Sequence, residues 1–82
     1  MSTNIDRRDD VDPEDGIEKY GDVEFADSVN HKYPVDTPGH VRAAWSYINR
    51  KDNAAAYDRD DLKTIKERIK RAAKKHGVEI DD

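Results

Sequence analysis

Apolar residues recur at helical spacing in two stretches of the chain, and these stretches predict the two main elements. The apolar positions of the first stretch are Val41, Ala44, Trp45 and Ile48. Those of the second are Leu62, Ile65, Ile69, Ala72 and Ala73. Residues three and four apart share one face of an α-helix, so both stretches predict amphipathic helices, over about residues 38–49 and 59–76.

The residues at the helix ends agree with these bounds. Thr37 is a good N-cap residue, and Pro38 suits the first helical position, where its missing N–H costs nothing. Asp60 and Asp61 place negative charge in the first turn of the second helix, which the helix dipole favours. Gly77 suits the left-handed residue that commonly follows a helix. A short middle turn joins the two helices, so we expect them to pack as an antiparallel hairpin.

Residues 23–35 fit neither the helical nor the strand period throughout. Tyr33 precedes Pro34, and the residue before a proline favours extended geometry. We therefore expect an irregular strap whose Phe25, Tyr33 and Val35 cover the open face of the helix pair, since two helices alone have hardly any core.

Residues 1–22 are acidic and poor in apolar residues, with eight acidic side chains against three basic ones. The pairs Asp12–Pro13 and Asp15–Gly16 are typical of turns and chain breaks. Such a segment buries too little apolar surface to offset roughly 1–2 kcal/mol of backbone entropy per ordered residue. The expected organisation is a disordered acidic tail at 1–22 and a small helical domain at 23–82. The expected fold class is all-α, a small antiparallel helical hairpin with a strap.

Composition limits the chain to a small protein. Its 82 residues are enough for one domain, and 41% of them are charged while 34% are hydrophobic. No apolar run is long enough to span a membrane, and the first residues carry no signal peptide. We expect a cytoplasmic protein that does not bind membranes, with a monomer favoured.

The residue types that carry chemistry are scarce, which predicts that the protein is not an enzyme. There is no cysteine, and no serine, threonine or lysine lies in a recognisable nucleophile motif. His31, His40 and His76 do not have the spacing of metal ligands, and the glycines form no phosphate-binding loop. We expect no catalytic residue, no metal and no cofactor.

The second predicted helix is strongly basic, with seven basic residues against one acid between positions 62 and 76. Cations on one helix face can meet a phosphate backbone. The residues that would do so are Lys63, Lys66, Lys70, Arg71 and Lys74. Any solvated amphipathic helix has a similar polar face, and docking of a protein or of the acidic tail is a further alternative. No aromatic residue lies among these cations to stack on bases.

Five short motifs together form a distinctive pattern over about residues 24–80. They are F-A-D at 25–27, K-Y-P-V-D-T at 32–37, H-V-R-A-A-W-S-Y-I at 40–48, N-A-A-A-Y at 53–57 and L-x-x-I-x-x-R-I-x-x-A at 62–72. This pattern resembles a small domain family of unassigned function from bacteria and their phages. The chain departs from it at Gly39, where the family usually has an acid. The resemblance implies a phage or prophage association, since the module occurs alone or fused to head-morphogenesis proteins such as prohead proteases.

Four residues within or beside these motifs are candidates for binding a protein partner. Packing and capping do not require Lys32, His40 or Arg42, and Tyr47 lies off the apolar stripe, where an exposed tyrosine beside an arginine can be a binding hot spot. The polar residues could equally form a hydrogen-bond set that holds the strap to the helices. We predict a non-enzymatic interaction module that binds an unidentified protein, with nucleic-acid binding along the basic helix as the alternative.

Overall fold

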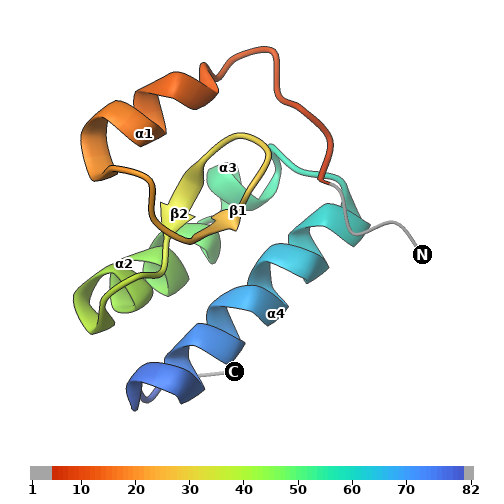
Figure 1. Cartoon of the computed structure of the whole chain (residues 1–82). Helices are drawn as coiled ribbons and strands as arrows, with labels where there is room; N and C mark the ends of the chain where they lie inside the picture. Colours follow the sequence, from red (N-terminus) through yellow and green to blue (C-terminus); the bar gives the residue numbers. More distant parts are fainter. Residues whose placement is uncertain (1–4, 81–82) are drawn as a thin grey trace.

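The computed structural model describes residues 5–80 of the chain (Figure 1). Within that range it contains four helices and one two-stranded antiparallel sheet. They are α1 (Pro13–Tyr20), β1 (Phe25–Asp27), β2 (Lys32–Pro34), α2 (Pro38–Ile48), α3 (Lys51–Ala54) and α4 (Arg59–His76). Residues 1–4 of the predicted tail and the acidic end at 81–82 lie outside the described residues.

The two predicted helices are present with nearly the expected bounds. Thr37 caps α2, since its Oγ1 accepts the backbone N–H of His40 at 3.1 Å. Gly77 ends α4 in the left-handed conformation, with φ of 68°. The middle turn contains the short helix α3. Figure 1 shows α2 and α4 packed against each other beneath the sheet.

The prediction of an all-α fold is wrong, because the strap forms a β-hairpin and the protein is a small mixed α/β fold. Phe25 pairs with Pro34 and Asp27 pairs with Lys32. The side chain of Asp27 closes the turn between the strands, since its Oδ1 accepts the backbone N–H groups of Val29 and Asn30 at 3.1 and 2.9 Å. A carboxylate that satisfies turn amides in this way favours a tight reversal over a helix.

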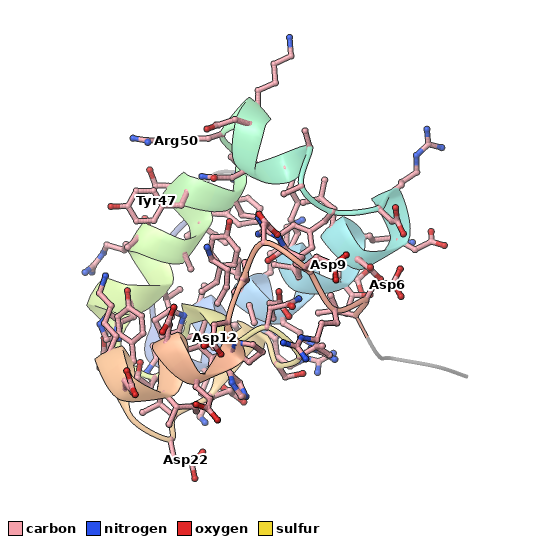
Figure 2. All side chains as sticks on the ribbon, turned by 90° about the horizontal axis from the view of Figure 1, so that it is seen from above. Asp6, Asp9, Asp12, Asp22, Tyr47 and Arg50 are labelled. Atoms are coloured by element: carbon pink, nitrogen blue, oxygen red, sulfur yellow. The ribbon has the colours of Figure 1, made fainter. Side chains whose placement is uncertain are left out.

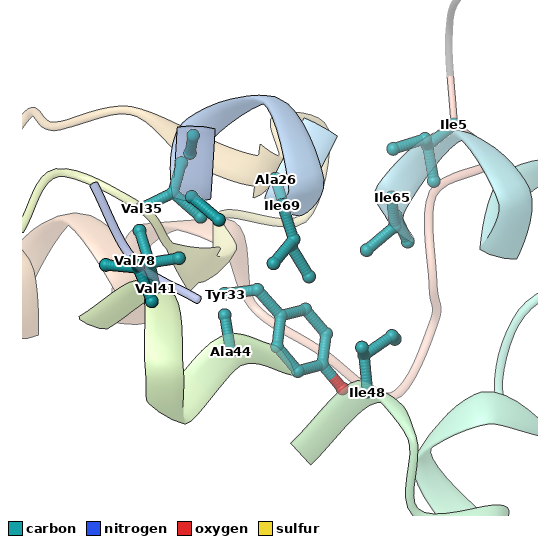
Figure 3. Packing of buried hydrophobic residues seen from close by; sticks show 12 residues of the cluster. Ile5, Ala26, Tyr33, Val35, Val41, Ala44, Ile48, Ile65, Ile69 and Val78 are labelled. Atoms are coloured by element: carbon teal, nitrogen blue, oxygen red, sulfur yellow. The ribbon is translucent and has the colours of Figure 1, made fainter. Parts of the chain in front are cut away.

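The prediction of a disordered acidic tail is also wrong for the described residues. Asp12 caps α1 by accepting the N–H of Glu14, and Pro13 occupies the start of the helix. Ile5 is 3% exposed and lies on the Ile65 side of the core cluster (Figure 3). The buried Ile5 and the capped start of α1 order this segment, although its apolar residues are too few to predict it. The predicted domain boundary after residue 22 stays a prediction, because contacts across it do not show whether 23–82 folds alone.

The core lies between α2, α4 and the hairpin (Figure 3). Its largest fully buried apolar side chains are Ile48, Ile65, Ile69, Val35 and Val41. Trp45, which the apolar stripe places in the core, is only partly buried, with Lys70 Nζ 5.7 Å from the centre of its ring. No helix within residues 5–80 is both long enough and apolar enough to cross a membrane.

Candidate functional site

Helix α1 lies beside β2 and α2 and leaves a cleft of about 440 Å³. We name it the α1–α2 cleft. Residues that define it are Asp15 and Tyr20 of α1, Lys32 and Tyr33 of β2, and His40 and Tyr47 of α2. Three elements that are separate in the sequence therefore build one concave surface.

The position of α1 depends on a glycine. A Cβ atom at Gly16 would lie 2.7 Å from the Cβ of His31, and closer still to the His31 carbonyl oxygen. His31 also holds α1 through its ring, since its Nδ1 lies 2.8 Å from the carbonyl oxygen of Pro13. A carbonyl only accepts, so Nδ1 carries the proton in this contact. The backbone of α1 thus sits directly on the hairpin turn.

His40 and Asp36 form a polar pair at the entrance to α2. Nδ1 of His40 lies 2.6 Å from Oδ1 of Asp36. This hydrogen bond lowers the pKa of Asp36 below its ordinary value. The ring of Tyr20 meets the His40 ring edge-on, with centroids 5.4 Å apart. One wall of the cleft therefore combines an aromatic ring with a charge-assisted hydrogen bond.

Tyr47 forms the outer rim of the cleft. Among the large hydrophobic side chains of residues 5–80, it is the one that lies exposed, with 49% of its surface accessible. The guanidinium carbon of Arg50 lies 5.2 Å from the centre of its ring, and both side chains point outward in Figure 2. Nδ2 of Asn53 donates to the Tyr47 carbonyl at 2.8 Å, which holds this corner in place.

The structure brings together three of the four residues predicted to bind a partner. Lys32, His40 and Tyr47 all line the α1–α2 cleft, although they come from two elements. Arg42 does not line it and lies exposed elsewhere on α2. His40 and Tyr47 are seven residues apart, which puts them on one helix face, whereas Arg42 is off that face.

A buried polar network was missed by the sequence reading. Asp27 and Asn30 are fully buried, and Nδ2 of Asn30 donates to Asp27 Oδ2 at 2.9 Å. The hydroxyl of Tyr57 donates to the same oxygen at 2.6 Å. Burial and this hydrogen bond raise the pKa of Tyr57 above its ordinary value. The signal that could have found the network is an Asp and an Asn three residues apart after an apolar strand.

The network also anchors the N-terminal segment. The backbone N–H of Arg8 donates to Oδ1 of Asn30 at 2.7 Å. Nδ2 of Asn30 donates to the carbonyl of Asp6 at 3.1 Å. The guanidinium of Arg8 lies 5.1 Å from the centre of the Tyr57 ring. The segment that leads into α1 is thus tied to the hairpin turn and to Tyr57, two residues before α4.

Comparison with family profiles matches residues 1–82 to a family of unknown function, DUF6582. The chain belongs to this family. The predicted membership of a small family without an assigned function is confirmed, and the match extends over the N-terminal segment that the motif pattern did not cover. The comparisons with curated proteins and with solved structures found no significant match.

The cations predicted to bind nucleic acid all lie on α4, but they border different features of this DUF6582 domain. One row along α4 consists of Lys63, Lys66, Lys70 and Lys74. This row lies on the side of Trp45, which contacts Lys70. Arg71 borders a second groove beside β1. Lys70 and Arg71 thus border different features, and the nucleic-acid role of the set stays a prediction.

Three carboxylates meet where the N-terminal segment reaches the start of α4. Oxygen atoms of Asp6, Asp58 and Asp61 lie within 4.8 Å of one another. Asp58, which is hydrogen-bonded to Asp6, and the charge of Asp61 together raise the pKa of Asp6 above its ordinary value of 3.8. Carboxylate oxygens are ligands for Ca²⁺ and Mg²⁺, so this family member could hold a cation here. Exposed acidic clusters are common without one, so we assign no metal site.

Replacing Asp58 with asparagine is expected to raise the melting temperature at neutral pH by about 1–3 °C, since it removes one repulsive charge. The folded state takes up the Asp6 proton more readily than the unfolded state does, because the pKa of Asp6 is raised. Protonated Asp6 therefore stabilises the folded state at acid pH, and this stabilisation is lost as the pH rises through the raised pKa of Asp6. Melting curves at pH 3 and pH 7 should show the gain only at pH 7.

The matched control is Asp60→Asn, which removes a carboxylate from the same turn of α4 but outside the cluster. It is expected to leave the melting temperature unchanged or lower it slightly, because an acid near a helix N-terminus is favourable. An equal gain from both variants would mean that repulsion within the cluster is not the cause.

Proposed function

We propose that the protein is a non-enzymatic interaction module that binds a partner protein through the α1–α2 cleft. The observation that carries this proposal is the convergence of Lys32, His40 and Tyr47 on one concavity. Tyr47 is half-exposed and lies beside Arg50. An exposed aromatic ring next to an arginine is typical of a binding hot spot, and Lys32 and His40 add polar groups to the same cleft. Cleft volume of this size suits a few side chains of a partner.

The non-enzymatic part of the proposal rests on how the buried polar groups are used. Asp27 and Asn30, the buried polar residues within the described range, make their hydrogen bonds inside the fold. Side chains committed to a turn and to a tyrosine hydroxyl stabilise the structure and do not act on a substrate. The sequence also has no cysteine.

A phage or prophage setting is the finer part of the proposal, and it rests on the motif resemblance. A survey of the genes that neighbour members of this family tests it. Enrichment of phage structural genes beside them is the expected result, and a neighbourhood indistinguishable from random bacterial genes would contradict it.

Nucleic-acid binding along α4 is supported less well. Of the five predicted cations, Arg71 borders the groove beside β1 and Lys70 lies against Trp45. A phosphate backbone is followed best by a continuous row of cations. No residue of the lysine row lines the α1–α2 cleft or the groove beside β1.

Photo-cross-linking in the native host tests the proposed cleft. The photoreactive residue p-benzoylphenylalanine would replace Tyr47, which preserves an aromatic ring at the rim of the cleft. The matched position is Glu67, which is exposed on α4 and distant from the cleft lining. We expect a discrete adduct from position 47 that is weakened by Lys32→Ala and His40→Ala. The same adduct from position 67, or none from position 47, would contradict the proposal.

A further inference from the structure

A second concavity of about 490 Å³ lies between the hairpin and α4. We name it the basic groove, and its defining residues are Phe25, Ser28, Arg68, Arg71 and Lys75. Helix α1 contacts β2 whereas α4 contacts β1, so the basic groove and the α1–α2 cleft flank the hairpin. His31 borders both.

The basic groove is lined by three cations from one flank of α4. Arg68, Arg71 and Lys75 are three and four residues apart, so they follow one another along the helix. Nη1 of Arg68 donates to the carbonyl of Ala26 at 3.0 Å and lies 3.2 Å from Ser28 Oγ. These contacts fix a positive charge in the wall. Arg71 and Lys75 are exposed at the mouth.

The opposing wall is partly apolar. Phe25 and Val35 line the groove from the hairpin side, and the buried Ala72 adds an apolar side chain on the α4 side. Glu24 is the carboxylate among the lining residues, so positive charge exceeds negative charge in the groove. A ligand that fits this surface carries several negative charges on a narrow chain.

We propose that the basic groove docks an acidic segment of a partner protein. Carboxylates of the segment pair with Arg71 and Lys75 at the mouth, in the field of the fixed guanidinium of Arg68, because a planar guanidinium accommodates a carboxylate with two parallel hydrogen bonds. The volume accommodates a few side chains of an extended peptide. A duplex presents its phosphates on the outside of a wide, rigid rod, and a short hollow with three cations fits that shape poorly.

Fluorescence anisotropy with a defined probe tests this docking site. The probe is a fluorescein-labelled peptide of about twelve residues that is rich in glutamate, and its control carries glutamine at every glutamate. The full chain is expected to bind the glutamate peptide saturably and more weakly as salt rises. The double variant Arg71→Gln and Lys75→Gln should weaken binding about tenfold, as expected for the loss of two charged contacts.

The matched control removes the same charge from the other flank of α4. Lys63→Gln and Lys74→Gln lie outside the basic groove, and glutamine keeps a similar helix propensity. This variant should weaken peptide binding by less than about twofold. Circular dichroism melts verify that both double variants are folded. If the variant with Arg71→Gln and Lys75→Gln is unfolded, Lys75→Gln alone replaces it, with an expected loss of binding of about threefold.

Several outcomes would overturn the proposal. They are absence of saturable binding, equal binding of the glutamine peptide, and equal weakening by the two double variants. Tighter binding of a labelled DNA duplex than of the peptide would assign the cations to nucleic acid instead. The basic groove is tested without Lys32, His40 or Tyr47, so its failure leaves the proposed function of the α1–α2 cleft standing, and the converse also holds.

Discussion

Replacing Asp27 with alanine is expected to lower the free energy of unfolding by about 3–5 kcal/mol. Asp27 is fully buried and accepts hydrogen bonds from two turn amides, from Asn30 Nδ2 and from the Tyr57 hydroxyl. Without the carboxylate these buried donors lose their acceptor, and each unsatisfied group costs about 1–3 kcal/mol. A chain of this length is stable by only about 4–12 kcal/mol, so the loss is a large fraction of the total stability. Chemical denaturation followed by circular dichroism measures the loss.

Two further variants separate the network from the loss of a charge. Asp22→Ala makes the same substitution at an exposed position (Figure 2) and should change stability by no more than about 0.5 kcal/mol. Tyr57→Phe keeps the ring and removes one donor to Asp27, and it should cost about 1–2 kcal/mol. If Asp27→Ala were as stable as Asp22→Ala, the carboxylate would not organise the hairpin turn.

Replacing Gly16 with alanine is expected to destabilise the protein by about 1–3 kcal/mol, although alanine is the better helix former. In an exposed helix the change would stabilise by about 0.5–1 kcal/mol. Here the new methyl group would collide with the His31 backbone, which has no flexible end that can move aside. Helix α1 must then shift away from the hairpin, and the α1–α2 cleft loses a wall. Thermal melts give the sign of the effect.

Gly39→Ala is the matched control, because Gly39 lies in the first turn of α2 and a Cβ atom there would meet nothing within 4 Å. It should leave stability unchanged or raise it by up to about 0.5–1 kcal/mol. Stabilisation by both substitutions would show that α1 does not rest on His31. Opposite signs would show that the contact, and not helix propensity, decides the position of α1.

The helices were predictable where a capping signal and an apolar stripe coincide. Thr37–Pro38 precedes a clear stripe, and α2 begins there as expected. Asp12–Pro13 is the same signal, a capping side chain followed by a proline, yet no stripe follows it and α1 has no buried residue. Without an apolar stripe after it, Asp12–Pro13 is typical of a turn and does not predict a helix start. Cap chemistry therefore carries more information than periodicity in a short surface helix.

The hairpin and the cleft depend on contacts between residues that are far apart in the sequence. Asn30 binds the backbone of Arg8, and Tyr57 binds Asp27. Strands of three residues are too short to show an alternating pattern. Lys32, His40 and Tyr47 are candidates because packing does not require them, and their role in binding a partner stays a prediction. Their meeting in one cleft follows from the placement of α1, which the sequence did not reveal.

In the structure the N-terminal segment folds onto the hairpin and completes the α1–α2 cleft. Amide hydrogen exchange of the full chain, measured by NMR, tests this arrangement. The N–H of Arg8 bonds to Asn30, and the N–H of Gly21 bonds to Ile17 at the end of α1. Both amides should exchange at least about tenfold more slowly than in an unstructured peptide. Exchange of both at the unstructured rate, with α2 and α4 protected, would contradict this arrangement.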